Sequence, residues 1–363
     1  MLARWLAALG AFVIVILIGI VTIGNFGTGI DPDSFFDSEG ANSFALIGAI
    51  ALVVGFIAYA AVEYAQTRSF ASISSQFDTR TIVLMPIAIA INIILGATVA
   101  NALKLPIYLD SIGTILVAAL AGPVPGALTG FLSNILWTYV VPPPFQNGPA
   151  AAFSIVAVVI GVMAGFAARG GWMRPRRSRS TGELAVGAIV ALVIVVGLGI
   201  YAYTRFYGST VQLFVEGSEP IFVILSWLII LIFAAILVGF VVLLFVRRDL
   251  AVPYVTVAGV VTGVVAALIS APISANVFGG VTGGGTDFLV AAFRQAGSDI
   301  QTATFQQGLL SDPVDKLVTF FVVYLILAAM ARRMKARFPQ GELLVDELEE
   351  DTADADEWRG ATA

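Results

Sequence analysis

The side chains that could do chemistry in this sequence are few and of limited kinds. The chain contains no histidine and no cysteine. It therefore lacks the commonest general base and metal ligand, every thiol nucleophile and every disulfide. The remaining carboxylates, amides, hydroxyls and basic groups can hold a polar ligand by hydrogen bonds and charge. We therefore expect a binding protein with no resident metal or cofactor, and not an enzyme.

Several of these polar groups stand in or beside long apolar stretches, where an ionisable or amide side chain is costly and usually functional. Asp110 follows Leu-Pro-Ile-Tyr-Leu at 105–109, where it could cap a helix or bind a polar group of a ligand. Trp137 could be an interfacial anchor or a ligand contact, whereas Asn134 stands deeper in its stretch. The candidate substrate-binding residues are Asp110, Asn134, Trp137, Asn276, Thr286, Asp287 and Lys316.

A glycine-rich segment at 278–288 invites comparison with a phosphate-binding loop. It lacks the Gly-Lys-Ser/Thr ending and does not join a strand to a helix, so we reject a nucleotide site. It could be a flexible hinge, or a lid whose backbone contacts a ligand together with Thr282, Thr286 and Asp287. We expect the long connection from Pro272 to Asp312 to fold back over the outer mouth of a helical bundle.

The segment Asp312-Pro313-Val314-Asp315-Lys316 has the signature of a helix start, with an acidic cap and proline at the first position. A cation is unfavourable at that end of a helix. We therefore expect Lys316 to pair with Asp312, Asp315 or Asp110.

Asn92, Gly96 and Ala100 are four residues apart and share one face of a helix. Small residues at this spacing let helices pack closely, either within a chain or with another membrane protein. We predict that this face is a partner interface.

The elements that must position these residues lie in a membrane. The chain has 363 residues, of which 59% are hydrophobic and 12% charged, with a mean hydropathy of +0.96. A soluble domain has about twice that share of charge. A span needs about 20 mostly apolar residues, and we predict an all-α polytopic protein with about ten transmembrane helices. Their approximate limits are 5–24, 42–65, 81–100, 107–122, 124–141, 150–168, 183–203, 220–246, 251–271 and 314–331.

The basic residues predict the orientation of these helices. With both termini in the cytoplasm of a multi-pass cell-membrane protein, ten spans place all but four basic residues of the membrane body inside, as the positive-inside rule requires. The basic cluster at 169–179 is expected to touch anionic membrane lipid. Acidic residues dominate from Glu342 to Glu357, so we predict that 334–363 is a cytoplasmic acidic tail without fixed structure.

Three segments together resemble the substrate-binding S components of energy-coupling factor (ECF) transporters, a bacterial family. They are Leu-Pro-Ile-Tyr-Leu-Asp-Ser-Ile-Gly-Thr at 105–114, Ala-Gly-Pro-Val-Pro-Gly-Ala-Leu-Thr-Gly at 121–130 and Asp-Pro-Val-Asp-Lys at 312–316. The resemblance implies an S-component-like six-helix core at 81–333, with a helix pair inserted near 183–246 and a two-helix membrane extension at 1–80. It also implies capture of a small-molecule, vitamin-like substrate, with transport driven by a scaffold transmembrane subunit and cytoplasmic ATPase subunits. No nucleic-acid partner is expected.

Three other functions are less favoured than substrate capture. A membrane sensor or regulatory module that signals through a partner protein is the main alternative. An ion-coupled secondary transporter would favour paired buried carboxylates near the bilayer midplane, and buried acids are scarce here. A membrane enzyme is the least favoured function because the residue census leaves no base, nucleophile or metal cluster.

Overall fold

The computed structural model describes residues 2–23, 39–176, 180–206, 220–246 and 248–345. Within these ranges every regular element is helical, and each of the ten predicted apolar stretches overlaps a helix. The fourth stretch begins too early, since its helix α5 starts only at Ile112, and the tenth covers only the later part of α12. The elements before the Pro-rich loop at 140–147 are α1 (Leu2–Ile23), α2 (Glu39–Thr67), α3 (Ala71–Ser74), α4 (Thr79–Gly96), η1 (Ala97–Ala102), α5 (Ile112–Ala121) and α6 (Pro123–Tyr139). Those after it are η2 (Gly148–Phe153), α7 (Ser154–Arg169), α8 (Thr181–Phe206), α9 (Pro220–Val241), η3 (Val242–Val246), α10 (Ala251–Phe278), α11 (Asp287–Gln295), α12 (Ile300–Ala329), α13 (Arg332–Lys335) and η4 (Gly341–Leu344).

Six helical stretches of the described residues are long and apolar enough to cross a membrane by themselves. They are Leu2–Thr22, Asn42–Thr67, Thr79–Ala102, Gly148–Arg169, Thr181–Thr204 and Ala251–Phe278. The protein is thus an all-helical, multi-pass membrane protein. The other predicted stretches include the 10-residue α5 and the 17-residue α6, which form a tight hairpin around Gly122 at φ 130°.

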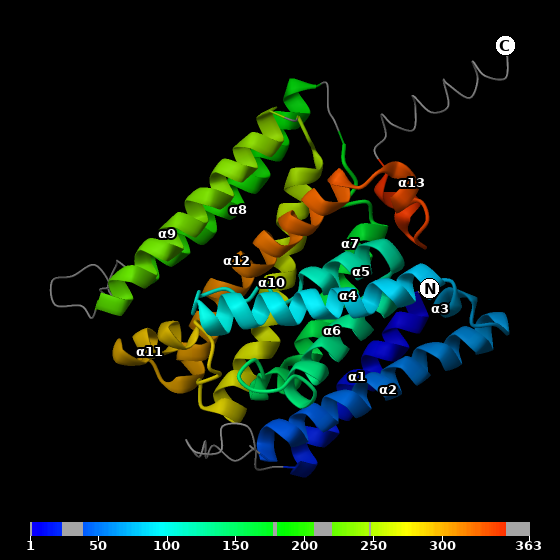
Figure 1. Cartoon of the computed structure of the whole chain (residues 1–363), viewed down its shortest axis with the longest axis horizontal. Helices are drawn as coiled ribbons and strands as arrows, with labels where there is room; N and C mark the ends of the chain where they lie inside the picture. Colours follow the sequence, from blue (N-terminus) through cyan, green and yellow to red (C-terminus); the bar gives the residue numbers. More distant parts are fainter. Residues whose placement is uncertain (1, 24–38, 177–179, 207–219, 247, 346–363) are drawn as a thin grey trace.

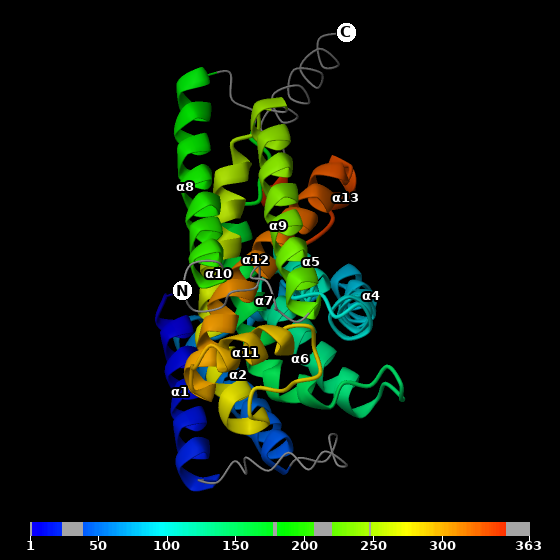
Figure 2. The same cartoon turned by 90° about the vertical axis from the view of Figure 1, so that its left-hand side faces the viewer.

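Helix α5 is the centre of the bundle. All of its residues are buried, and it packs against α4, α6, α7 and α12. A helix that is apolar all round needs such complete enclosure. The pairs α6 with α7 and α10 with α12 complete the wall around it, while α1 with α2 and α8 with α9 lie on opposite flanks of this core (Figures 1 and 2).

The predicted helix start at Asp312 is wrong. Helix α12 begins twelve residues earlier, at Ile300, where the Asp299 side chain accepts a hydrogen bond of 3.0 Å from the Thr302 backbone N–H. Pro313 therefore lies inside the helix. The prediction failed because Asp299 caps the helix upstream of Asp312, through its bond to Thr302.

The long outer connection is also shorter than predicted. Helix α10 continues to Phe278 with Pro272 inside it, and the left-handed Gly279 at φ 58° ends it. The connection thus consists of the glycine-rich loop 279–286, α11, and a turn at 296–299.

The described part of the predicted tail is folded onto the bundle. The Gln340 backbone N–H donates to the Leu120 carbonyl at 2.8 Å, and Leu344 is fully buried. The boundary at residue 334 is therefore corrected to a point after Val345. The acidic residues from Asp346 onward lie outside the described residues.

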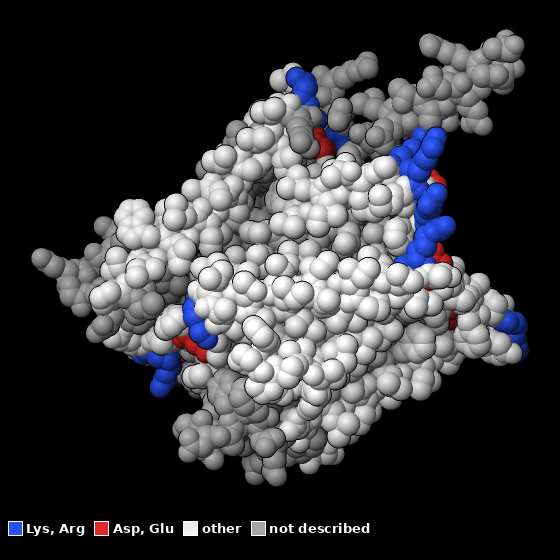
Figure 3. All heavy atoms as spheres, viewed as in Figure 1, with Lys and Arg blue, Asp and Glu red and all other residues white. Residues whose placement is uncertain are grey.

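Basic side chains gather along the side of the molecule where α4 begins and α13 lies, with a smaller group near α11 at the other end (Figure 3). The predicted orientation would place the larger of these two groups in the cytoplasm.

Candidate functional site

A cavity of about 100 Å³ lies between the central helices and the connections at one end of the bundle. Its walls come from the end of α4 and η1, the segment 103–111, α6, the loop before η2, α7, α10, the glycine-rich loop and α12. Its polar lining comprises Asn101, Tyr108, Asp110, Ser111, Asn134, Asn147, Ser270, Thr282, Asp312 and Lys316, and Trp137 and Phe153 supply aromatic surface. The structure thus brings Asp110, Asn134, Trp137 and Lys316 together, as predicted residues of one cavity.

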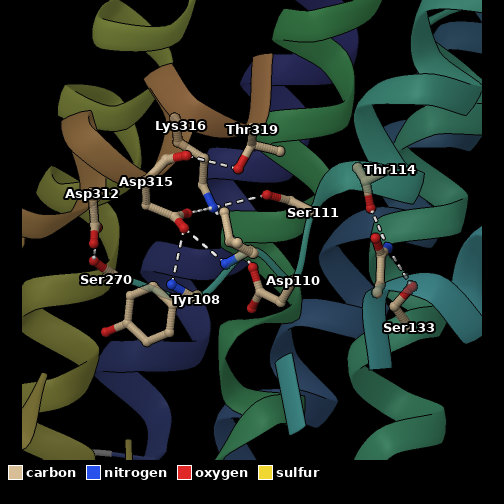
Figure 4. A network of polar contacts seen from close by, with 12 residues as sticks. Tyr108, Asp110, Ser111, Thr114, Ser133, Ser270, Asp312, Asp315, Lys316 and Thr319 are labelled. Carbon is tan, nitrogen blue, oxygen red and sulfur yellow. Dashed lines mark hydrogen bonds and ion pairs between the residues drawn. The ribbon is translucent and has the colours of Figure 1, made fainter. Parts of the chain in front are cut away.

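Lys316 is the buried cation of this site (Figure 4). Its Nζ donates to the Asp315 carboxylate at 2.5 Å and to the Ser111 hydroxyl at 2.8 Å. The Asp110 carboxylate lies 3.6 Å away. Since a buried charge is tolerated only when paired and hydrogen-bonded, these contacts explain how a lysine persists at this depth. Of the three predicted pairings, those with Asp315 and Asp110 are present.

Asp315 also holds the chain segment that precedes α5. Its second carboxylate oxygen accepts hydrogen bonds from the backbone N–H groups of Tyr108 at 2.9 Å and Leu109 at 2.8 Å. Leu109 has a φ of 53°, a left-handed conformation that is unfavourable for a leucine. The fixed backbone directs the following residue, Asp110, toward Lys316 and the cavity (Figure 4).

Capping does not explain Asp110. The N-cap of α5 is Ser111, whose side chain makes no capping hydrogen bond. The Asp110 side chain keeps 29% of its surface exposed. It is therefore the carboxylate of the lysine cluster that a ligand can reach.

A second carboxylate, Asp312, enters the cavity from one turn earlier on α12. It accepts hydrogen bonds from the hydroxyls of Ser270 at 3.0 Å and Ser311 at 3.1 Å, and Gln307 donates to Ser311 at 2.6 Å. The predicted pairing of Asp312 with Lys316 is replaced by these hydroxyl contacts in the described structure.

Two amides offer hydrogen-bonding capacity to the cavity. Asn134 is 7% exposed, and its side-chain amide makes no hydrogen bond within the described part of the chain. The Asn147 side-chain oxygen is buried and has no partner among the described residues. A buried amide without a partner costs free energy, which a ligand with matching groups would recover.

The glycine-rich loop closes one side of the cavity. Gly285 donates from its backbone N–H to the Ala100 carbonyl at 3.0 Å, and Lys104 donates to the Gly283 carbonyl at 2.5 Å. Thr286 and Tyr108 share a hydrogen bond of 2.8 Å between their hydroxyls. The loop thus folds back over the bundle as expected, and Thr286 reaches the site through Tyr108.

Asp287 organises this loop from within. Its carboxylate accepts hydrogen bonds from the backbone N–H groups of Thr282 at 3.0 Å and Gly283 at 2.7 Å. Burial raises the pKa of the Asp287 carboxyl above its usual value, and these donors act in the opposite direction. Asp287 supports the loop and is not among the residues that line the cavity.

Asn276 lies apart from the other predicted residues. Its side chain is exposed, accepts a hydrogen bond of 2.9 Å from Gln301 and donates to the Pro272 carbonyl at 2.8 Å. It is not part of the cavity lining.

The face formed by Asn92, Gly96 and Ala100 is buried inside the chain, and its prediction as a partner interface is corrected. The Asn92 amide donates to Thr114 and Ser133, both at 2.9 Å, and accepts from the Gly113 N–H at 2.7 Å. These bonds fasten α4, α5 and α6 together. The exposed face of α4 is a different one, formed by Ile82, Val83, Ile87 and Ile94.

Gly96 packs against the indole of Trp137. A Cβ at Gly96 would lie 2.4 Å from that ring and 3.0 Å from the Asp110 Cβ. The Trp137 indole N–H donates to the Phe145 carbonyl at 2.8 Å. The small residue of the predicted face thus makes room for the cavity's aromatic wall.

The sequence prediction missed Tyr108, Ser111, Asn147 and Ser270. Tyr108 and Ser111 stand within two residues of Asp110 in the segment 105–114, so their closeness in sequence to Asp110 was a usable signal. Asn147 lies in the loop that follows the three prolines at 142–144, and Ser270 lies in the long apolar helix α10. Only the tertiary fold brings these two residues to the cavity.

Chemically, the arrangement combines the reachable Asp110 carboxylate with buried cavity-lining groups on Asp312, Asn134 and Asn147 and with aromatic surface. It suits a small organic molecule that carries N–H or O–H donors beside an apolar ring. Ligand sites usually enclose roughly 300–1,000 Å³, so the cavity of about 100 Å³ must widen for such a molecule. Within the described residues, no group of three or more carboxylates could hold a metal ion.

Comparison with known proteins gave one match. The family described as "ECF transporter, substrate-specific component" matches residues 80–247. This segment includes α4 to α9, and thus also the helix pair α8 and α9. It ends before α10 and α12, the helices that carry Ser270, Asp312 and Lys316. No curated protein and no solved structure matches the chain.

Proposed function

We propose that this chain captures a small organic, vitamin-like molecule for an ATP-driven importer, because residues 80–247 match the family described as "ECF transporter, substrate-specific component". Components of this family are transport subunits and not enzymes, and ATP hydrolysis belongs to separate subunits. The chain would therefore act with a transmembrane scaffold and cytoplasmic ATPases.

The observation that carries the proposal is the cavity. It joins the family-matched helices α4, α6 and α7 to the unmatched α10 and α12. Its unpartnered amides and reachable carboxylate supply specific recognition, while Trp137 and Phe153 supply apolar contact. Its charged groups Lys316 and Asp312 are held in place by hydrogen bonds to neighbouring side chains, as a preorganised binding site requires.

The glycine-rich loop covers the cavity, and opening of this loop would give a ligand its route of entry. The loop is held by a few hydrogen bonds to residues 100–108, and we place it at the outer face on the predicted orientation. Release of these bonds would open the cavity to the outside and widen it. Their re-formation would retain the ligand.

The test is purification of the full-length chain from its native membrane in mild detergent, followed by mass spectrometry of copurified proteins and of extracted small molecules. We expect an ATPase pair, a scaffold membrane protein and one enriched organic compound. A known ECF complex purified in parallel serves as the control for complex retention.

Absence of the ATPases and the scaffold, while the control complex stays intact, would contradict the proposal. Copurification of a histidine kinase or another signalling protein in their place would favour the sensor alternative. An enriched compound without ATPases would support ligand capture but overturn its coupling to an importer.

A further inference from the structure

An apolar groove separates the N-terminal helix pair from the core. It lies between α1 and α2 on one side and α6 and α7 on the other, and has a volume of about 510 Å³. Leu9, Phe12, Phe56, Val159 and Met163 are among its lining residues, and nearly all of the lining is apolar. The volume falls within the range of ordinary ligand sites, roughly 300–1,000 Å³.

The groove runs beside helices long enough to span a membrane. Its walls are therefore at the depth of lipid acyl chains. An apolar wall alone does not identify an occupant, since any lipid or apolar helix fits it. The polar groups at one end of the groove make the distinction.

Three aromatic rings close this end. The Trp5 ring lies 4.9 Å from that of Tyr59 and 4.8 Å from that of Phe166, in edge-to-face geometry. The Trp5 indole N–H is buried and has no hydrogen-bond partner in the described structure. A buried indole donor usually finds an acceptor, so this one indicates that an acceptor is supplied from outside the chain.

A cation lies beside the same rings. Arg169 is half-buried, follows Phe166 by three residues on α7, and is close enough to Tyr59 for electrostatic interaction. No hydrogen bond or ion pair of Arg169 with another described residue is present. By contrast, Arg4 at the same end is paired with Glu63 at 3.2 Å.

We propose that this groove binds one anionic phospholipid, with an acyl chain between α1 and α7 and its phosphate at the Trp5 indole N–H and the Arg169 guanidinium. Arginine is suited to phosphate because its planar donors match the phosphate oxygens. The site faces the leaflet on the side where basic residues gather (Figure 3), which the predicted orientation makes the cytoplasmic leaflet. The bound lipid would seal the N-terminal helix pair to the core.

The test uses native mass spectrometry of the full chain in detergent, titrated with phosphatidylglycerol or with phosphatidylcholine of the same acyl composition. We expect one tightly retained phosphatidylglycerol, bound at least about tenfold more strongly than phosphatidylcholine. Arg169→Gln should reduce phosphatidylglycerol binding to the level of phosphatidylcholine, and should affect phosphatidylcholine much less, because its choline cation already offsets the charge of its phosphate. Val159→Trp, which fills the groove, should weaken both lipids at least about tenfold.

Arg68→Gln is the matched control, because Arg68 is an exposed arginine on the same side, just beyond the end of α2. It should behave like the unaltered protein. Equal binding of the two lipids by the unaltered chain would overturn the proposal. So would equal effects of Arg169→Gln and Arg68→Gln, or unchanged binding after Val159→Trp.

A second measurement does not depend on any variant folding. Phosphatidylglycerol with a photoreactive group in its acyl chain should label residues of α1, α2, α6 or α7 that line the groove. Labelling confined to other helices, or a copurified polypeptide crosslinked in the groove in place of lipid, would contradict the assignment.

Discussion

The Asp315 carboxylate accepts a hydrogen bond of 2.9 Å from the backbone N–H of Tyr108, a residue 207 positions earlier in the chain. This bond joins the middle of α12 to the segment that enters α5. Because the same carboxylate pairs with Lys316, one buried acid fixes both the backbone of the site and its cation. Asp110, which is partly exposed, is left to meet a ligand.

The first prediction concerns this division of labour. Asp315→Ala removes the main partner of a buried lysine, and an unpaired buried charge costs about 3–5 kcal/mol. We expect a large fall in the midpoint of thermal unfolding, followed by tryptophan fluorescence in detergent. Asp110→Asn should lower the midpoint much less, since Asp110 lies 3.6 Å from Lys316 and is partly exposed. Equal loss in both variants would refute the distinction.

The second prediction concerns ligand binding. Asp110→Asn replaces a carboxylate of the cavity with a neutral amide, and a hydrogen bond to a charged group contributes about 1.5–3 kcal/mol. Asn134→Ala removes an amide, and a buried ligand group left without a partner costs about 1–3 kcal/mol. We expect each variant to retain at least about tenfold less of the small molecule that copurifies with the unaltered protein, measured per mole of protein by mass spectrometry. Membrane insertion should not change.

Asn276→Ala is the control for these variants. Asn276 is an exposed amide on α10 that bonds to Gln301 outside the cavity. It should retain the ligand fully. A loss in Asn276→Ala with none in Asn134→Ala would move the site from the cavity to the outer connection.

The helices and the hairpin at Gly122 were predictable because a membrane span depends on its local sequence, a run of apolar residues that a turn ends. Asp110, Asn134, Trp137 and Lys316 were also found from the sequence, since polar groups in such runs are rare. These signals need no knowledge of which helices are neighbours.

Which way a helix faces is not a local property, and the predictions that depended on it failed. The Asn92, Gly96 and Ala100 face has the spacing of a helix contact, but the sequence cannot say that α5 and α6 of the same chain occupy it. The Asp312-Pro313 pair reads as a cap, and only the position of Ser270 on α10 shows why Asp312 is needed inside a helix. Asn147 reaches the site through a loop that carries no periodic signal.

The third prediction tests the close approach of α4 and α5. A Cβ at Gly113 would lie 2.1 Å from the Ala88 carbonyl oxygen, and a backbone atom cannot move aside cheaply. Gly113→Ala should therefore separate the helices, strain the bond to Asn92 and cost at least the roughly 1–3 kcal/mol typical of overpacking. The unfolding midpoint should fall accordingly.

Gly197→Ala provides the matched comparison, because a Cβ at this position of α8 meets nothing within 4 Å. Alanine favours a helix over glycine by about 1 kcal/mol, so this variant should be as stable as the unaltered chain or more so. If both glycine variants behaved alike, the close approach at Gly113 would not be what limits stability.

The last prediction is a dependence on pH at the start of α12. Hydrogen bonds from the Thr302 hydroxyl at 2.7 Å and the Thr302 backbone N–H at 3.0 Å lower the pKa of the exposed Asp299 carboxyl below its usual value. A lowered pKa means that the folded state binds the proton less readily than the unfolded state. The cap is therefore fully effective above the ordinary aspartate pKa of about 3.9 and is lost as the pH falls through the lower, folded value.

Protection of the amides at 302 and 303 against hydrogen exchange, corrected for the intrinsic rate, should fall on acidification in the unaltered protein. In Asp299→Asn, which caps without titrating, protection should not depend on pH, and in Asp299→Ala it should be low throughout. A pH-dependent loss that persists in Asp299→Asn would assign the effect to another group.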